Sequence, residues 1–299
     1  MLSQLEGNAG PVFQKLNENP SDKLALSVDE ERTLRVFLGL QITRTTIAGE
    51  RLNDSVDKLT KIAFSRKAER EGIDLSRVKI GYDQPIFPSM QNFLLYATFI
   101  EDLPIHLLVN ETEFPFATSD NPVVLYNQYC EPVHKIGRIG ADCRGLQIFF
   151  PISPTRMLLL YDPKIYALSG KQSAGTPIEL SDARSLNLLT AVNADKVLLF
   201  SDWDSRVELE NVVRKAARFS DEERVVVNEF QADDDENRFL VQVAFPTPNV
   251  NLRLSFMRIR RRAQSTPPRI RAIEFRTFRG GTSKSSAATT RTFRRVERP

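Results

Sequence analysis

The sequence predicts an α+β fold, in which an N-terminal helical subdomain packs on a central mixed or antiparallel sheet, followed by further helices and a C-terminal hairpin. Three observations support this prediction. In the first third of the 299 residues, apolar residues recur every three or four positions, as on one face of a helix. Short apolar runs separated by Pro, Asn, Asp and Gly follow, as in strands joined by turns. Helical periodicity then returns before two final β-rich runs.

These changes of pattern divide the chain into three parts. We expect a helical subdomain at residues 1–104 and a sheet-centred part of the same domain at residues 105–257. Residues 258–299 hold 13 Lys and Arg but 2 Asp and Glu, a net charge of +11, whereas the rest of the chain carries −8. This last part is poor in aliphatic residues and has no sustained period, so we expect a basic, disordered tail.

Helices are predicted first. Ser27 and Glu30 have the spacing of a capping box, in which each side chain bonds the backbone of the other. The apolar stripe that follows indicates a helix to about Ala48. Further helices are predicted at residues 53–71 and 90–101.

Strands are predicted in the middle of the chain. The runs that alternate or are apolar throughout lie at residues 105–111, 123–127, 146–152 and 156–162. The last two contain the nearly continuous apolar sequences LQIFF and MLLLY. Strands that are buried on both faces have this pattern, so we expect these two in the centre of the sheet.

The remaining elements are a helix at residues 181–195, a strand at 197–200 and a helix at 206–218. Two β-rich runs then flank the acidic turn at residues 233–237, which predicts a hairpin.

The composition favours a cytoplasmic protein with no membrane association. The longest apolar stretch, residues 93–100, is far shorter than the roughly 20 residues of a spanning helix. The first residues, MLSQLEGN, resemble no signal peptide. Two cysteines in a chain of this length do not form a disulfide framework, which favours a reducing compartment.

Common catalytic and nucleotide-binding motifs are missing from the sequence. It contains no phosphate-binding loop with the required Lys, no GxGxxG after a strand and no GxSxG. Cys130, His134 and Cys143 lie within fourteen residues and could supply two thiolates and an imidazole to zinc. Their spacing matches no established zinc motif, so two thiols in a loop are the favoured interpretation.

The most pointed local feature is the segment Thr118-Ser119-Asp120-Asn121-Pro122 between two predicted strands. Asp and Asn can bond their own backbone two residues on, so a rigid turn is the favoured interpretation. The alternative is that the turn presents Asp120 and Asn121 at the end of a strand, where a carboxylate could hold a metal or act as a base.

Four segments read in order, FLGLQITRT, TSDNPVVLY, FPISPTRMLLLYD and SLNLLTAVNADKVLLFSD, resemble a bacterial family called domain of unknown function 4238. The resemblance spans residues 1–245 and implies an intracellular α+β protein of unassigned activity. By motif match it carries over the polar positions Gln41, Arg44, Ser119, Asp120, Asn121, Ser153 and Asn187. Members of the family usually open with an H-Y-V-P-like block and an aromatic-rich strand. This chain lacks both, which we interpret as a sign of truncation.

Three functions remain open at this stage. The first is a binding or structural role without catalysis. The second is a metal-dependent hydrolase or nuclease, with a divalent metal as cofactor. In it Asp120 would be ligand or base, Asn121 and Asn187 would orient the substrate, and Arg44 would bind phosphate. The third is nucleic-acid contact through residues 258–299, by phosphate neutralisation and stacking.

Overall fold

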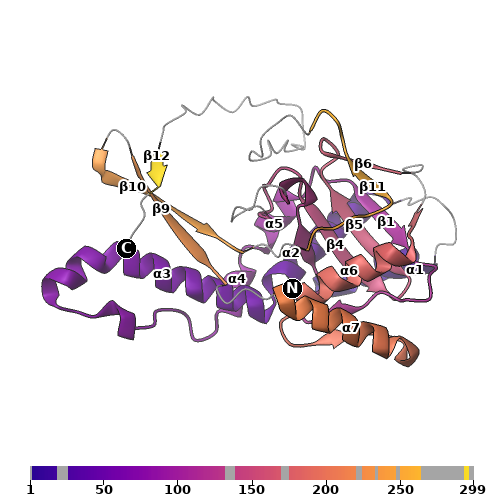
Figure 1. The fold of residues 1–299 in the computed structure, drawn as a ribbon, viewed down its shortest axis with the longest axis horizontal. Coiled ribbons are helices and arrows are strands. Elements are labelled where there is room, and N and C mark those ends of the chain that lie inside the picture. The colour runs from indigo at the N-terminus through magenta and orange to yellow at the C-terminus, as the bar shows by residue number, and fades with distance from the viewer. Residues whose placement is uncertain are drawn as a thin grey trace.

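The computed structural model confirms the α+β class (Figure 1). It describes residues 2–18, 26–131, 139–169, 175–219, 224–232, 235–246, 250–263 and 293–295. The helices are α1 (Leu2–Glu18), α2 (Val28–Thr43), α3 (Thr46–Glu71), α4 (Ile86–Met90), α5 (Phe93–Phe99), α6 (Leu180–Asn193) and α7 (Arg206–Ala216). None of the helices in these ranges is both long and apolar enough to cross a membrane.

A five-stranded mixed sheet lies at the centre. Its strands, in spatial order, are β3 (Val124–Tyr126), β4 (Gln147–Ser153), β5 (Arg156–Tyr161), β1 (Ile105–Val109) and β7 (Thr176–Pro177). Neighbouring strands are antiparallel except β1 and β7, which are parallel. The two strands with continuous apolar runs, β4 and β5, are interior strands, as predicted.

Both faces of the sheet are covered, which explains those apolar runs. Met157 and Leu159 of β5 pack in the core cluster that includes Leu186 of α6. Leu158 and Leu160 point the other way, into the cluster that includes Leu34 of α2. Successive side chains of a strand face opposite sides, so a strand between two helical layers must be apolar at every position.

The smaller strands of the described residues form three further sheets. They are β2 (Thr118–Ser119) with β8 (Leu198–Leu199), β6 (Tyr166–Leu168) with β11 (Met257–Ile259), and β9 (Val226–Ala232) with both β10 (Asp235–Ala244) and β12 (Phe293–Arg295). The antiparallel pair β9 and β10 is the predicted hairpin. It lies beside α3, which extends away from the sheet (Figure 1).

Two helix boundaries differ from the prediction. The helix expected to reach Ala48 ends at Thr43, and α3 begins at Thr46. The cause is Thr45, whose hydroxyl accepts the backbone N–H of Ala48 at 3.2 Å and so caps a new helix. The helix expected at residues 90–101 is the two short helices α4 and α5.

The fold also continues beyond Met257, where we expected the tail to begin. Residues 257–259 form β11, and Ala263 is 1% exposed in the core. Of the predicted tail, residues 264–292 and 296–299 lie outside the described residues.

Candidate functional site

The turn that contains Asp120 is tied to the chain after α6. The carboxylate of Asp120 accepts the backbone N–H groups of Asp195, Lys196 and Val197 at 2.9, 2.8 and 3.1 Å. Burial raises the pKa of Asp120, but these hydrogen bonds together outweigh it, so the pKa is lowered. The carboxylate therefore serves as an anchor for residues 195–197.

The neighbouring predicted residues also bond backbone. Asn121 donates its side-chain amide to the carbonyl of Asn193 at 2.9 Å, and Asn193 donates its own to the carbonyl of Asn121 at 2.9 Å. The hydroxyl of Ser119 accepts the N–H of Asn121 at 3.2 Å. These contacts support the structural interpretation of the turn.

Asn187 of α6 also bonds backbone groups through its side chain. Its side chain is fully buried, accepts the N–H of Ala117 at 2.9 Å and donates to the carbonyl of Pro115 at 2.8 Å. Both bonds hold the extended segment that leads into β2.

The other carried-over positions lie elsewhere. The buried Gln41 accepts a hydrogen bond from Arg44 at 3.0 Å, and Arg44 also pairs with Glu6 of α1. Ser153, at the end of β4, is opposite Arg156. Their predicted binding roles stay predictions.

The predicted metal ligands are only partly described. Cys130 is buried and Cys143 partly buried, and they are not joined in a disulfide. His134 lies outside the described residues. Within the part of the chain that is described, no group of three or more His, Cys, Asp or Glu could hold a metal ion. The zinc site stays a prediction.

A pocket of about 220 Å³ lies where the start of α3 meets α5, β3 and the end of β10. We call it the Arg51 pocket. Asn121 is the only residue of the predicted set among those that line it. Its lining is mixed, with aliphatic walls and neutral polar groups, and consists of Ile42, Thr43, Thr45, Ala48, Arg51, Leu52, Ser55, Ser89, Asn92, Tyr96, Asn121, Val123, Leu125, Ile139, Gly140, Asn193 and Phe245.

The periodicity of α3 places Arg51 in this pocket. Thr45 fixes the start of the helix, and Ala48, Arg51, Leu52 and Ser55 follow at the spacing of a single helix face. An arginine thus occupies a position on a stripe that otherwise carries small or apolar residues and one serine.

Arg51 carries a charge that the described chain does not neutralise. Its Nε atom is buried and has no hydrogen-bond acceptor, and no Asp or Glu is among the described residues that line the pocket. The guanidinium lies over the ring of Phe245, 5.3 Å from its centroid. Burial lowers the pKa of Arg51, and Tyr96 opposes this shift. An arginine nevertheless stays protonated in proteins.

Tyr96 and Ser89 add hydroxyl groups beside the guanidinium. Burial raises the pKa of Tyr96, Arg51 lowers it, and Asp142 raises it further, so Tyr96 stays a neutral donor. Ser89 is 8% exposed. The pocket therefore offers one cation and several neutral donors to whatever occupies it.

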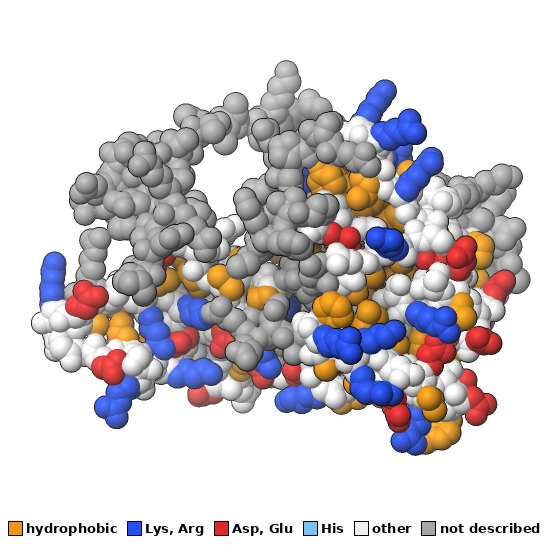
Figure 2. Space-filling view, viewed as in Figure 1, with side chains coloured by type: hydrophobic (Ala, Val, Ile, Leu, Met, Phe, Trp, Pro, Cys, Tyr) orange, Lys and Arg blue, Asp and Glu red, His pale blue; other side chains and the backbone are white. Residues whose placement is uncertain are grey.

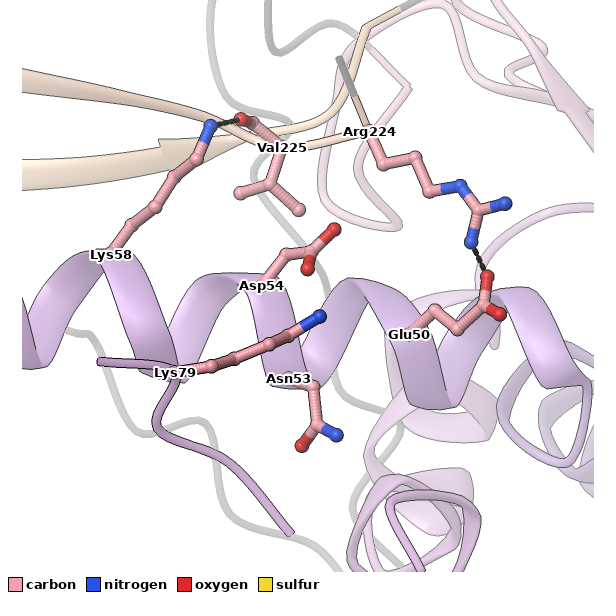
Figure 3. A pocket seen from close by; sticks show the side chains of 7 residues that line it. All are labelled: Glu50, Asn53, Asp54, Lys58, Lys79, Arg224 and Val225. Atoms are coloured by element: carbon pink, nitrogen blue, oxygen red, sulfur yellow. Dashed lines mark hydrogen bonds and ion pairs between the residues drawn. The ribbon is translucent and has the colours of Figure 1, made fainter. Parts of the chain in front are cut away.

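The opposite face of α3 lines a second, more open pocket of about 460 Å³ (Figure 3). We call it the charged pocket. Glu50 pairs with Arg224, and Lys58 donates to the carbonyl of Val225, so both side chains reach from α3 to the start of β9. Arg224 also lies 3.7 Å from a carboxylate oxygen of Asp195. The Glu50–Arg224 ion pair and the hydrogen bond of Lys58 attach the start of β9 to the helix.

The sequence contains a signal for the Arg51 pocket that we did not use. A long cationic side chain on the apolar stripe of an amphipathic helix indicates either a buried ion pair or a ligand site. The predicted hydrolase set emphasised the turn at Asp120 instead.

A family model described as protein of unknown function (DUF4238) matches residues 1–204. No curated protein and no solved structure matches the chain.

Proposed function

Since the chain belongs to the family of proteins of unknown function DUF4238, we propose its function from its own residues: it binds a small organic carboxylate in the Arg51 pocket. This is a binding role without catalysis, the first of the three functions that the sequence leaves open.

The observation that carries the proposal is the buried Nε atom of Arg51, which has no hydrogen-bond acceptor. A buried donor without an acceptor costs about 1–3 kcal/mol, and more where the group is charged. Here the described lining offers only neutral groups, and one guanidinium nitrogen has no acceptor at all. A bound carboxylate would remove that cost, because the planar guanidinium matches it through two parallel hydrogen bonds.

The rest of the lining favours a small, partly apolar ligand. The volume of about 220 Å³ is below the roughly 300–1,000 Å³ of drug-sized sites. Leu52, Val123 and Leu125 provide an aliphatic wall for the body of the ligand. A single cation balances a carboxylate better than a phosphate dianion.

The hydrolase alternative gains less support. The carboxylate of Asp120 accepts three backbone N–H groups, and Asn187 is committed to residues 115 and 117. Neither Arg44 nor Asp120 nor Asn187 lines the Arg51 pocket. A divalent metal cofactor and the use of Asp120 stay predictions, as do a bacterial origin and a cytoplasmic location.

The proposal is tested by thermal denaturation with acetate, propionate, butyrate and benzoate, each compared with its neutral amide. At a ligand concentration of about 100 times Kd, binding stabilises the folded state by about 2.7 kcal/mol. We expect at least one carboxylate to raise Tm and its amide to leave Tm unchanged. Arg51→Met should abolish the shift, and Arg70→Met, at the exposed end of the same helix, should retain it.

Arg51→Lys tests whether binding needs the two-point hydrogen bonding of a guanidinium or only a positive charge. It keeps the cation but loses the two-point hydrogen bonding, so we expect about tenfold weaker binding. A Tm shift that survives Arg51→Met, or no shift with any carboxylate, would contradict the proposal.

A further inference from the structure

The sequence RIRRR at residues 258–262 belongs to the folded body of the protein. Met257 pairs with Leu168 and Ile259 with Tyr166 in the short sheet of β6 and β11. The side chain of Arg260 donates to the carbonyls of Pro163 and Tyr166, both at 2.9 Å. Strand pairing therefore holds the backbone at Arg258, and two hydrogen bonds hold the side chain of Arg260.

These residues line a third pocket, a groove of about 840 Å³, which we call the basic groove. Its charged side chains are all cations, namely Lys164, Arg258, Arg260, Arg261 and Arg262. All five are exposed, and Figure 2 shows Lys and Arg side chains gathered over the region of β6 and β11. Its remaining lining is Pro163, Ala167 and Ile259.

The nearest carboxylate in sequence is already engaged. Asp162 is 1% exposed, and it accepts the backbone N–H groups of Gly145 at 3.0 Å and Lys164 at 2.9 Å. No acidic side chain is among the described residues of the groove. The like charges of Arg258, Arg260 and Arg261 along one groove repel one another, and a polyanion would relieve that repulsion.

We propose that the basic groove binds the sugar-phosphate backbone of a nucleic acid strand. Arginine forks match phosphate oxygens through paired hydrogen bonds, and a row of them suits a chain of phosphates better than one anion. In the sequence, residues 264–299 directly follow the groove residues and carry nine more Lys and Arg.

The observations favour nucleic acid over an anionic membrane. Membrane-surface sites combine basic residues with apolar side chains that enter the lipid. Among the described residues at 163–169 and 256–263, no large hydrophobic side chain is exposed. The surface is concave and polar at its rim, which suits a strand better than a bilayer.

The test uses the full chain, fluorescence anisotropy and labelled oligonucleotides of about 20 nucleotides, as single-stranded RNA, single-stranded DNA and duplex DNA. The groove variant is Arg258→Gln/Arg261→Gln/Arg262→Gln, which leaves Arg260 and its backbone bonds in place. The matched control, Arg214→Gln/Lys215→Gln/Arg218→Gln, removes the same charge from exposed positions at the end of α7 and just beyond it.

We expect the groove variant to bind at least tenfold more weakly near 0.1 M salt, with the slope of log K against log salt reduced by about 2 for a single strand. The control should bind like the unaltered protein. Circular dichroism should show both variants folded, and Arg261→Gln alone should weaken binding in the same direction if the triple variant is unstable.

Three results would overturn the proposal. Unchanged binding by the groove variant would assign any affinity to other basic residues. An equal loss in both variants would indicate net charge alone. Stronger retention on vesicles of phosphatidylserine than on any oligonucleotide would assign the groove to a membrane surface.

Discussion

The two faces of α3 handle charge in opposite ways. On one face, Glu50 and Lys58 reach partners at the start of β9. On the other face, Arg51 lies against Phe245 with no anion among the described residues that line its pocket. One face of α3 thus uses charged side chains to attach β9. The other face presents a cation that has no anionic partner in the described lining of its pocket.

The difference indicates where to look for function in a chain without a catalytic motif. Paired charges at partly exposed positions contribute little to stability. A desolvated charge without a partner is costly, so we expect an outside anion to act at Arg51 sooner than at the charged pocket. Three experiments test this difference in how charge is accommodated.

The largest effect is expected from Arg51→Glu. It replaces a cation that has neutral neighbours with a carboxylate in the same surroundings and removes the stacking on Phe245. We expect a loss of about 3 kcal/mol in the free energy of unfolding, measured in urea, and no binding of carboxylates. Arg70→Glu, at the exposed end of α3, should cost less than about 1 kcal/mol. Equal costs at the two positions would mean that the Arg51 pocket is as open to water as the surface.

A buried base that can lose its proton extends the comparison. His106 of β1 is 4% exposed and bonds Thr176 at 2.7 Å, and burial lowers its pKa. Below pH about 6.5, His106 takes up a proton in the unfolded chain, whereas in the folded chain it stays neutral until the pH reaches its lowered pKa. Stability should therefore fall with decreasing pH below that value, by up to about 1.4 kcal/mol per unit.

His106→Gln keeps a side chain that can bond Thr176 but does not titrate. Urea unfolding between pH 7.5 and 5 should show a smaller slope in this variant than in the unaltered protein. Identical slopes would mean that other groups cause the acid sensitivity.

The smallest effect is expected on the charged pocket. Glu50→Gln removes one of the two carboxylates near Arg224, and the side chains of Glu50 and Arg224 are partly exposed, 36% and 43%, so water can solvate the arginine that remains. We expect a cost of about 0.5–1 kcal/mol. A double-mutant cycle with Arg224→Gln measures the coupling, and a coupling above about 2 kcal/mol would show that this face is as desolvated as the other.

Local patterns in the sequence were sufficient for most of the fold. The capping box at Ser27 and Glu30 is present with both hydrogen bonds. The continuous apolar runs of β4 and β5 placed both in the interior of the sheet. These features depend on neighbouring residues and on the two-residue period of a strand, which a sequence displays directly.

The misplaced boundaries have a different origin. The break between α2 and α3 depends on one threonine that caps a helix where the apolar stripe shows no gap. The strand at Met257–Ile259 exists because β6, some ninety residues earlier, offers it a free edge. The Arg-rich composition therefore predicted a disordered tail from residue 258, although residues 257–259 pair with a distant strand.

The candidate site was harder to predict for the same reason. The Arg51 pocket is distinguished by the absence of acidic residues from its described lining. Residues of α5, of β3 and just after β10 contribute that lining from distant parts of the sequence. Asp120 was selected from a turn segment and Asn187 from the family resemblance, but the backbone partners of both lie about 70 positions away.

The length of α3 gives the contrast between its faces a mechanical consequence. The helix has 26 residues and so spans about 39 Å, with both pockets at its first turns and the far end away from the sheet (Figure 1). By geometry alone, a tilt of about 5° at the start of this helix would move its far tip by about 3 Å, so a small adjustment around a ligand would be magnified at the end of the helix.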